Sequence, residues 1–404
     1  MSKLQMPLSI WTTITYLCPM IYRNLENKLR QLATKFPVIS LTGPRQSGKT
    51  TLVRMVFPDY QYVSLEEPDM RLYAQADPRG FLANHPDGLI LDEIQRAPDL
   101  FSYIQSVVDK NSKTGQFILT GSQNFLLLEK ISQSLAGRVA VLKLLPFSLD
   151  ELKNAGMLHS RYGSVLRQGF YPRLYDKHIA PEDYYPNYIQ TYLERDVRQI
   201  KNITDLNAFT RFLKLCAGRT GQLINLSALG QEAGIAHSTA KAWISLLETS
   251  YILFLLYPHH RNFNKRLVKS PKLYFFDTGL ACSLLGINQD SQIESHYLRG
   301  SLFENMVIAD VYKNFSNDGK EPPITFWRDK TGHEIDLLIE SGKDVHPVEI
   351  KSGQTISGDF FRNMNFFNDL SGQTGQPATL VYGGDREQKW NDIQVRSWQN
   401  IKLF

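Results

Sequence analysis

The residues Gly43 to Thr50 read Gly-Pro-Arg-Gln-Ser-Gly-Lys-Thr and match the spacing GxxxxGK[ST]. This spacing is typical of a phosphate-binding loop, because it gathers backbone N–H groups around the anion, places a helix N-terminus behind it and adds an ammonium group. The loop follows the apolar run 38–41 and precedes a helix expected at 50–56. A strand, a glycine-rich loop and a helix in this order constrain this part of the chain to an α/β fold that binds a nucleotide.

Each residue of the loop has an expected role. Gly43 and Gly48 permit the tight turn, Lys49 reaches the β- and γ-phosphates, and the Thr50 hydroxyl holds Mg²⁺. We therefore expect ATP and Mg²⁺ as cofactors. The residues expected to contact the nucleotide are Gly43, Pro44, Arg45, Gln46, Ser47, Gly48, Lys49, Thr50 and Thr51.

Two further strand ends are expected to complete this site. The apolar run 88–91 leads into Asp92 and Glu93. We expect Asp92 to hold Mg²⁺ through water and Glu93 to act as the general base on the attacking water. The run 117–120 ends in Gly-Ser, so Thr120 and Ser122 are candidates for a polar sensor beside the γ-phosphate.

An arginine near a later strand has two possible functional roles. Arg138 precedes the apolar run 139–144. It is a candidate finger on a neighbouring subunit's nucleotide, or a sensor of the nucleotide in its own subunit. The structural alternative is a surface arginine with no catalytic role.

The alternation of apolar runs and helical stretches predicts the domain organisation. Runs at 60–65, 88–91, 116–120 and 139–144 alternate with helices, which is typical of a parallel sheet with crossover helices. The pattern stops near 145–147, the chain then reads as mostly helical to about 257, and strand and helix signals mix again after 271. We predict an α/β core at 20–147, a helical region at 148–270, an α/β domain at 271–404, and an N-terminal extension or mis-assigned start at 1–19.

Composition narrows the functional classes. The net charge of +5 permits nucleic acid as a partner without requiring it. The 3 cysteines are far apart, which argues against a disulfide framework or a zinc site and fits a reducing cytoplasm. The apolar run 8–22 contains threonines and a proline and is shorter than the roughly 20 residues of a membrane helix, so we expect no membrane span.

The helical region contains a pattern typical of a winged helix-turn-helix. Residues 227–234 and 237–248 predict two helices with Gly234 in the turn, followed by an apolar strand. The second helix and the basic stretch 257–272, which has no acidic residue, predict contacts with DNA. The alternative is a helical connector whose basic stretch contacts the protein itself. The second helix also carries Trp243, and the basic stretch ends at Lys272. The predicted DNA-binding residues are Ser238, Thr239, Lys241, Arg261, Lys265, Arg266 and Lys269.

A second cluster of charged residues is expected near the C-terminus. Residues 333–340 and 345–351 predict two antiparallel strands joined by the turn 341–344. Because side chains two apart share a strand face, Glu349 and Lys351 point to one side, and Asp336 on the adjacent strand can face them. Two carboxylates and the Ile350 carbonyl suit Mg²⁺ or Mn²⁺, and Lys351 could activate a water for attack on a phosphodiester.

The first group of motifs resembles a known family. The loop 43–50, Leu-Asp-Glu-Ile-Gln at 91–95, Leu-Thr-Gly-Ser at 119–122 and Ala-Gly-Arg at 136–138 look like those of bacterial and archaeal AAA+-type ATPases with a C-terminal domain of unknown function. The later signatures at 192–196, 274–280 and 303–305 extend the resemblance over nearly the whole chain. It implies ATP hydrolysis and homo-oligomeric assembly, and rings of six subunits are usual for AAA+ proteins.

The C-terminal pattern resembles a second fold. Asp336, Glu349 and Lys351 match the D…ExK pattern of the PD-(D/E)XK nucleases, and Glu304, on a helix expected at 301–312, matches the glutamate that such nucleases often add. Metal ligands are then expected at Glu304, Asp336 and Glu349. Folds of this type also serve as non-cutting DNA clamps, so cleavage is left open.

The combined expectation is an ATPase that acts on branched or damaged DNA in repair, recombination or defence, with a Mg²⁺-dependent endonuclease activity left open. Two alternatives belong to other classes. One is a nucleotide-dependent signalling switch with a non-cutting C-terminal domain, and the other is a DNA-binding regulator that uses only the winged helix.

Overall fold

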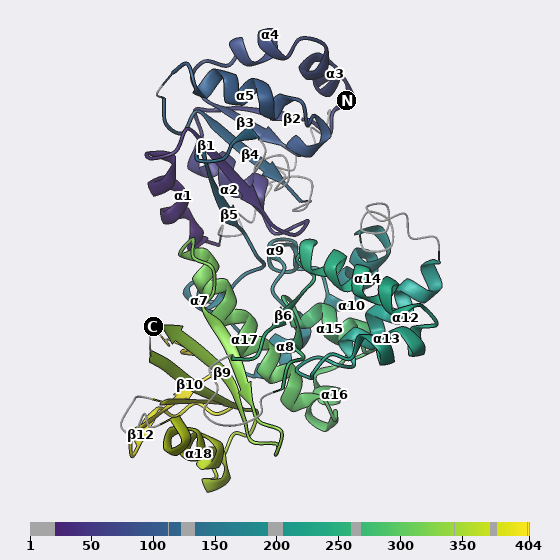
Figure 1. The fold of residues 1–404 in the computed structure, drawn as a ribbon, viewed down its shortest axis with the longest axis vertical. Helices are drawn as coiled ribbons and strands as arrows, with labels where there is room; N and C mark the ends of the chain where they lie inside the picture. Colours follow the sequence, from purple (N-terminus) through teal and green to yellow (C-terminus); the bar gives the residue numbers. More distant parts are fainter. Residues whose placement is uncertain are drawn as a thin grey trace, which may run out of the picture.

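The computed structural model describes residues 21–111, 113–122, 134–192, 205–259, 268–342, 344–371, 378–401 and 403. Figure 1 shows three parts: an N-terminal α/β core, a mainly helical middle region and a C-terminal α/β sheet domain. The predicted extension at 1–19 lies outside the described residues. Nothing in the described part of the chain forms a helix that is both long and hydrophobic enough to span a membrane.

The N-terminal core is a five-stranded parallel sheet with the order β2-β3-β4-β1-β5. Its strands are β1 (Val38–Thr42), β2 (Gln61–Ser64), β3 (Leu89–Asp92), β4 (Phe117–Gly121) and β5 (Val139–Lys143). Its helices are α1 (Leu25–Ala33), α2 (Lys49–Val56), α3 (Pro68–Ala76), α4 (Pro78–Ala83) and α5 (Leu100–Val108), with the 3-10 helix η1 (Ile94–Arg96). The prediction of a parallel sheet with crossover helices is confirmed.

The three central strands are apolar because both faces of the sheet are covered. Leu89, Leu91 and Phe117 pack on the side of α5, whereas Ile90 and Ile118 point to the opposite side and pack with α1 and α2. The period-2 alternation of the strands therefore fills two separate cores. This packing fixes the carboxyl ends of β1 and β3, where the phosphate loop and Asp92 lie.

The middle region consists of helices and one strand pair. Its elements are α7 (Leu149–Asn154), α8 (Tyr162–Gln168), α9 (Pro172–Asp176), α10 (Pro181–Tyr188), α12 (Leu206–Ala217), α13 (Leu226–Ala233), α14 (His237–Thr249), β6 (Leu253–Leu256) and β7 (Lys272–Phe275). β6 and β7 are antiparallel, so the boundary predicted at 270/271 falls between the two strands of one pair. Gly234 ends α13 in the left-handed conformation (φ 75°) and forms the turn to α14, as predicted.

The C-terminal domain is a six-stranded mixed sheet with the order β12-β13-β11-β10-β9-β8. Its strands are β8 (Ile324–Arg328), β9 (Glu334–Ser341), β10 (Asp344–Lys351), β11 (Ala378–Tyr382), β12 (Gln388–Trp390) and β13 (Ile393–Ser397). The helices that follow β7 in the chain are α15 (Thr278–Leu284), α16 (Asp290–Ser295), α17 (Arg299–Asn317) and α18 (Arg362–Ser371), with the 3-10 helix η3 (Gly358–Phe361). Of these, α15 and α16 contact α8 of the middle region, whereas α18 packs on β9 and β10. β9 and β10 are antiparallel with Ser341 opposite Asp344, which confirms the predicted hairpin.

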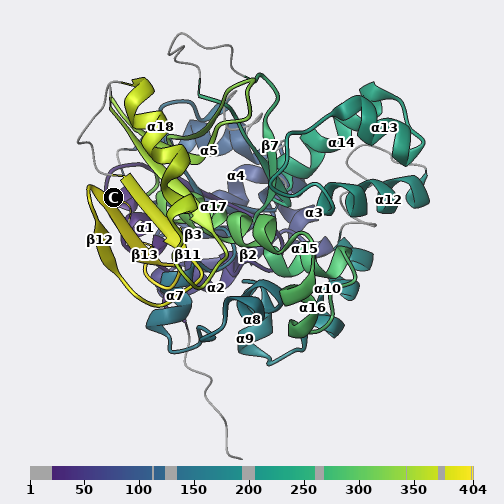
Figure 2. The same cartoon turned by 90° about the horizontal axis from the view of Figure 1, so that it is seen from below.

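The long helix α17 connects the three parts. It contacts α1 and β5 of the core, β7 of the middle region and β10 of the C-terminal sheet. In Figures 1 and 2 it runs between the N-terminal core and the C-terminal sheet. Asp310 of α17 accepts a hydrogen bond from the Leu149 backbone N–H at 2.7 Å, and Lys313 donates to the Phe147 carbonyl at 3.0 Å. The segment that leaves β5 is thereby attached to α17.

Candidate functional site

The phosphate loop has the backbone conformation that its glycines predict. Gly43 has a φ of 146°, and a Cβ atom there would lie 2.1 Å from the carbonyl oxygen of Leu144. Gly48 caps α2 with a φ of 91°, and Gln46 also has a positive φ of 62°. A side chain at position 43 would collide with the backbone of Leu144, the first residue after β5, so the loop requires glycine there.

The Lys49 side chain lies inside this loop. Its Nζ donates to the carbonyl oxygens of Gly43 at 2.9 Å and Pro44 at 2.8 Å. Burial disfavours the ammonium and lowers the pKa of Lys49 to about 8, although Glu93 and Asp92 oppose the shift. The ammonium group therefore lies at the carboxyl end of β1. Two of its three N–H groups donate to these carbonyl oxygens, and the third can donate to an anion.

Asp92 accepts hydrogen bonds from three hydroxyl groups. Thr50 and Tyr62 each donate to Oδ2 at 2.8 Å, and Thr120 donates to Oδ1. The structure thus brings together Thr50, Asp92 and Thr120, which the sequence predicts as parts of one site. Tyr62, on β2, was missed, because a tyrosine in an edge strand carries no motif.

Glu93 follows directly and has a strained backbone, with a φ of 54°. Gln95 Nε2 and Ser122 Oγ both donate to its Oε2, the latter at 3.4 Å. Ser122 therefore contacts Glu93, whereas Thr120 contacts Asp92. The two sensor candidates have separate partners.

The remaining residues of the loop face other parts of the protein. Arg45 forms an ion pair with Glu66 at 3.8 Å and lies over the ring of Tyr192. Thr51, the second residue after Lys49 in α2, is exposed. The Ser47 hydroxyl is buried without a hydrogen-bond partner among the described residues, but its carbonyl oxygen accepts a bond of 2.7 Å from Arg23.

Arg23 is a second residue that the sequence does not reveal. Besides Ser47, its guanidinium donates to the Leu145 carbonyl at 2.6 Å and to Glu151 Oε1 at 3.1 Å. Arg23 is 5% exposed, and it lies over the ring of Phe147. It therefore links the phosphate loop to the segment that leaves the core.

Arg138 lies at the wrong end of the sheet to act on the nucleotide of its own subunit. Its carbonyl pairs with Val38 N, at the start of β1, whereas the phosphate loop follows the end of β1. The strand between them spans about 13 Å. Its side chain forms a surface ion pair with Asp109 instead. Of the two functional roles considered, the sensor in its own subunit does not fit, because the parallel register holds Arg138 at the amino ends of the strands.

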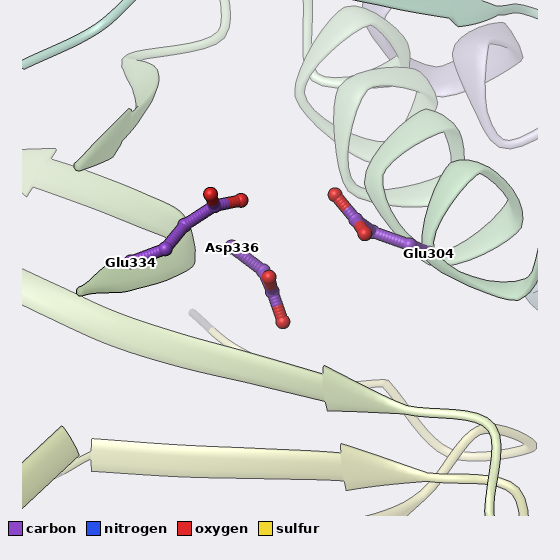
Figure 3. A group of neighbouring side chains, drawn as sticks. All are labelled: Glu304, Glu334 and Asp336. Carbon is purple, nitrogen blue, oxygen red and sulfur yellow. The ribbon is translucent and has the colours of Figure 1, made fainter. Parts of the chain in front are cut away.

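Figure 3 shows the second charged cluster, in which Glu304 on α17 faces Glu334 and Asp336 on β9. One carboxylate oxygen from each lies within 4.8 Å of the others. Asp336 Oδ2 accepts from the Ile350 N–H at 2.8 Å and from Lys351 at 3.4 Å, while Lys351 donates to Glu349 Oε1 at 2.7 Å. The four predicted residues therefore lie in one cluster. Asp336 comes from β9, Glu349 and Lys351 from the adjacent strand β10, and Glu304 from α17.

Two members of this cluster were not predicted as site residues. Glu334 begins β9 and pairs with Arg328 at 3.1 Å. Lys272, which the sequence grouped with a basic DNA-binding stretch, is 2% exposed and forms ion pairs with Glu304, at 2.9 Å, and with Glu334. Burial disfavours the ammonium, but Glu304 and the other nearby acids hold the pKa of Lys272 well above its ordinary value. This lysine contacts the protein itself, which is the alternative considered for the basic stretch.

The donor set of the cluster fits a hard divalent cation. Glu349 is 1% exposed, and its Oε2 atom has no hydrogen-bond partner among the described residues. Burial, and then the neighbouring Asp336, raise the pKa of Glu349 to about 8. A buried carboxylate oxygen without a partner beside other carboxylates suits Mg²⁺ or Mn²⁺, which bind oxygen ligands.

The predicted DNA-binding residues divide into three groups. On α14, Ser238 and Lys241 are exposed and Thr239 is half-buried, and on the segment before β7 Lys269 is exposed. Arg261, Lys265 and Arg266 lie outside the described residues. Trp243, expected on the DNA-facing helix, is instead a core residue: its ring contacts Phe209 and Phe212 at centroid distances of 5.2 and 5.4 Å.

Three family models match consecutive parts of the chain. Residues 35–153 match an AAA domain, residues 159–291 match a domain of unknown function (DUF8612), and residues 299–401 match a domain of unknown function (DUF4143). The AAA match contains the phosphate loop, Asp92 and Glu93. It confirms the expected AAA-type ATPase fold of the N-terminal part.

The chain is also similar to solved structures at low identity. One is the Walker-type ATPase PABY2304 of Pyrococcus abyssi, with a TM-score of 0.44 and 16% identity over 64% of this chain and 94% of that chain. Another is a variant of RuvB from Thermotoga maritima, with a TM-score of 0.31 and 18% identity over 57% and 88%. A third is AMPPCP-bound DnaA from Aquifex aeolicus, with a TM-score of 0.29 and 15% identity over 55% and 85%.

Relatives by sequence match most of the chain. The uncharacterized protein MJ1637 of Methanocaldococcus jannaschii is 25% identical over 94% of this chain and 86% of its own length. The uncharacterized protein Rv2008c of Mycobacterium tuberculosis is 30% identical over 336 residues, which are 83% of this chain and 75% of that protein. The chain therefore has an N-terminal AAA domain and belongs to the same family as Rv2008c.

Proposed function

We propose that the chain binds and hydrolyses ATP at the phosphate loop and uses the nucleotide cycle to act on DNA. The observation that carries the ATPase part is Asp92, which accepts hydroxyl hydrogen bonds from Thr50 of the loop helix and Thr120 of the adjacent strand. These bonds place a carboxylate and a threonine hydroxyl together beside Lys49. That is the arrangement a Mg²⁺–triphosphate requires.

In this proposal the loop amides and the Lys49 ammonium bind the β- and γ-phosphates. Mg²⁺ would be held by Thr50 and, through water, by Asp92, and it supplies positive charge to the phosphate oxygens. Glu93, whose carboxylate is oriented by Gln95 and Ser122, takes a proton from the attacking water. The oxygen of this water bonds to the γ-phosphorus, the bond to the bridging oxygen breaks, and ADP leaves.

Three observations support DNA as the partner. A short turn at Gly234 joins α13 to α14, which suits the proposed helix-turn-helix, and Ser238 and Lys241 are exposed on the second helix. Lys269, which lies just before β7, adds a positive charge at the surface. Phosphate contacts of this kind give a binding strength that falls as salt rises. We propose branched or damaged DNA as the substrate class.

We further propose that the C-terminal domain is a PD-(D/E)XK-like domain with a divalent cation at its carboxylates. Asp336, Glu349 and Glu304 would hold the cation, and Lys351 would assist a water that attacks a phosphodiester. We assign the ATPase core to 20–147, the winged-helix region to the chain from 148 through the β6–β7 pair, and this domain to the chain after that pair. Homo-oligomers, with six subunits as the usual number for AAA+ proteins, would let Arg138 reach the nucleotide of a neighbouring subunit.

One observation favours a second function. Lys272 already neutralises part of the carboxylate cluster, as expected of a C-terminal domain that does not cut and of a nucleotide-dependent regulatory switch. The test is ATP hydrolysis with and without duplex and four-way junction DNA, for the wild type, Glu93→Gln and Lys351→Ala. The proposal expects hydrolysis that DNA stimulates and that Glu93→Gln abolishes. Slow turnover without any DNA effect would favour the switch, and a gel shift without salt-sensitive binding would remove the DNA part.

A further inference from the structure

Lys272 is the cation at the centre of the C-terminal cluster. It is the first residue of β7, and its side chain extends to Glu304 on α17 and Glu334 on β9. These two glutamates come from different elements, and Lys272 is the residue that joins them. Two other cations contact the same cluster: Arg328 pairs with Glu334, and Lys351 pairs with Asp336 and Glu349.

The Lys272 ammonium overlaps part of the space that a metal ion held by Glu304, Glu334 and Asp336 would need. Glu304, Glu334 and Asp336 each direct a carboxylate oxygen to a point where the three oxygens lie within 4.8 Å of one another. The Lys272 ammonium contacts two of these three carboxylates directly. A divalent cation binds carboxylate oxygens at about 2.1 Å, so an ammonium group that already contacts the same two carboxylates competes with it for their negative charge. Two positive charges a few ångströms apart also repel each other strongly in a buried site.

We propose that the Lys272 ammonium competes with a divalent cation for Glu304 and Glu334, so that a cation binds the full cluster only when Lys272 leaves it. The inference rests on the proposed function in one respect, namely that the cluster binds a divalent cation. It adds an internal competitor that sets the cation affinity. Lys272 thereby keeps the carboxylates paired in the cation-free protein.

Two neighbours of Lys272 keep the glutamates paired in this exchange. Tyr274, two residues along β7, donates its hydroxyl to the same Glu304 oxygen, so this glutamate keeps a partner when the lysine leaves. Arg328 likewise keeps Glu334 paired. The lysine side chain has four flexible methylene groups, so the ammonium can move without a shift of the strand.

The test measures Mn²⁺ binding to the nucleotide-free full chain by electron paramagnetic resonance or calorimetry. Lys272→Met removes the competing charge and keeps the apolar stem. We expect its Kd for Mn²⁺ to be tighter than that of the wild type by about tenfold. Adding Asp336→Asn to Lys272→Met should abolish this gain, which would locate the added affinity in the cluster.

A matched control separates this effect from the general loss of a positive charge. Lys143, on β5, forms its described ion pair with Glu321, whose side chain is 79% exposed, and not with a carboxylate of the cluster. Lys143→Met should leave Mn²⁺ binding unchanged. If Lys272→Met has the wild-type Kd, or if neither protein binds Mn²⁺, the competition is refuted and Lys272 is a structural ion pair.

A measurement on the wild type covers the case in which Lys272→Met does not fold. Lysine acetylation followed by mass spectrometry should label Lys272 slowly in the cation-free protein, because its ammonium is buried and paired. Saturating Mn²⁺ should increase the labelling of Lys272 while that of Lys143 stays constant. Unchanged labelling of Lys272 would refute the proposal. None of these measurements uses DNA or ATP. If the protein neither cut DNA nor hydrolysed ATP, the proposed function would be refuted, but the competition between Lys272 and the cation would not.

Discussion

Replacing Glu151 by Gln is expected to loosen the phosphate loop from a distance, through Arg23. The Glu151 side chain is fully buried and that of Arg23 is 7% exposed. Glu151 accepts hydrogen bonds from Arg23 Nε, from Asn24 N at 2.8 Å and from Ser148 N at 2.9 Å. The guanidinium in turn holds the carbonyl oxygen of Ser47. Neutralising Glu151 leaves a buried cation without its counter-ion directly behind the loop.

The magnitude follows from the burial of the pair. Removing one partner of a buried ion pair costs about 3–5 kcal/mol, because the other charge stays desolvated. Glutamine keeps the shape and one acceptor oxygen, so we expect the lower end of this range, about 3 kcal/mol. Part of this loss appears in nucleotide binding, because the loop must then be ordered by the ligand. We expect the Kd for Mg·ATP to weaken by about tenfold, which corresponds to about 1.4 kcal/mol.

Hydrogen exchange is the suitable assay, since a chain of several domains does not unfold in one step. A local loss of about 3 kcal/mol accelerates exchange by about two orders of magnitude. This acceleration should appear in the amides of 38–52 and 144–152. Glu321→Gln is the matched control, because it breaks the surface pair with Lys143, in which Glu321 is 79% exposed. Unchanged exchange in both segments, with an unchanged Kd for Mg·ATP, would refute the role assigned to Arg23 and Glu151.

Four further predictions concern other parts of the chain. Because the free protein loses the Lys49 ammonium above pH 8, the Kd for Mg·ATP should weaken by about tenfold between pH 7 and pH 9, and a flat titration would contradict this. Thr120→Val removes a hydrogen bond to a carboxylate that is worth about 1.5–3 kcal/mol, so kcat should fall by about tenfold or more in a steady-state assay while the fold is retained. Trp243→Ala should destabilise the middle region by about 3–5 kcal/mol, whereas Ser238→Ala, on the exposed face of the same helix, should change thermal stability by less than about 0.5 kcal/mol. Arg138→Ala should leave ATP hydrolysis unchanged at dilutions where the protein is monomeric and lower it only in assembled protein, and an equal loss at all concentrations would exclude a role in a neighbouring subunit.

The sequence predicts those parts of the two sites whose residues are close together in the chain. The phosphate loop and the β9–β10 hairpin are each encoded within a short run of consecutive residues, and their spacing alone determines which side chains meet. The position of Arg138 follows from the parallel pairing of β1 and β5. Arg138 precedes β5, so it lies at the amino ends of these strands, whereas the phosphate loop follows β1 at their carboxyl ends. Motif spacing alone does not carry this information.

Lys272 and Arg23 could not be identified in this way. Lys272 reads as part of a basic stretch, and only the pairing of β7 with β6 and the packing of α17 bring it to Glu304. Arg23 precedes the first helix, and its partners Ser47, Leu145 and Glu151 lie on three separate segments. Such contacts depend on tertiary structure, and burial is what gives them their energetic weight.

The helix α17 relates these two sets of contacts to each other. Glu304 lies in its second turn, and Asp310 and Lys313, which bind the segment of Phe147 and Leu149, lie further along the same helix. The helix between Glu304 and Asp310 spans about 9 Å, a distance over which an α-helix behaves as a stiff rod. The same segment carries Glu151, the partner of Arg23 behind the phosphate loop. A displacement of this segment would therefore act on Ser47 through Arg23 and on Glu304 through α17, so the geometry of the carboxylate cluster and that of the phosphate loop depend on the position of one stretch of chain.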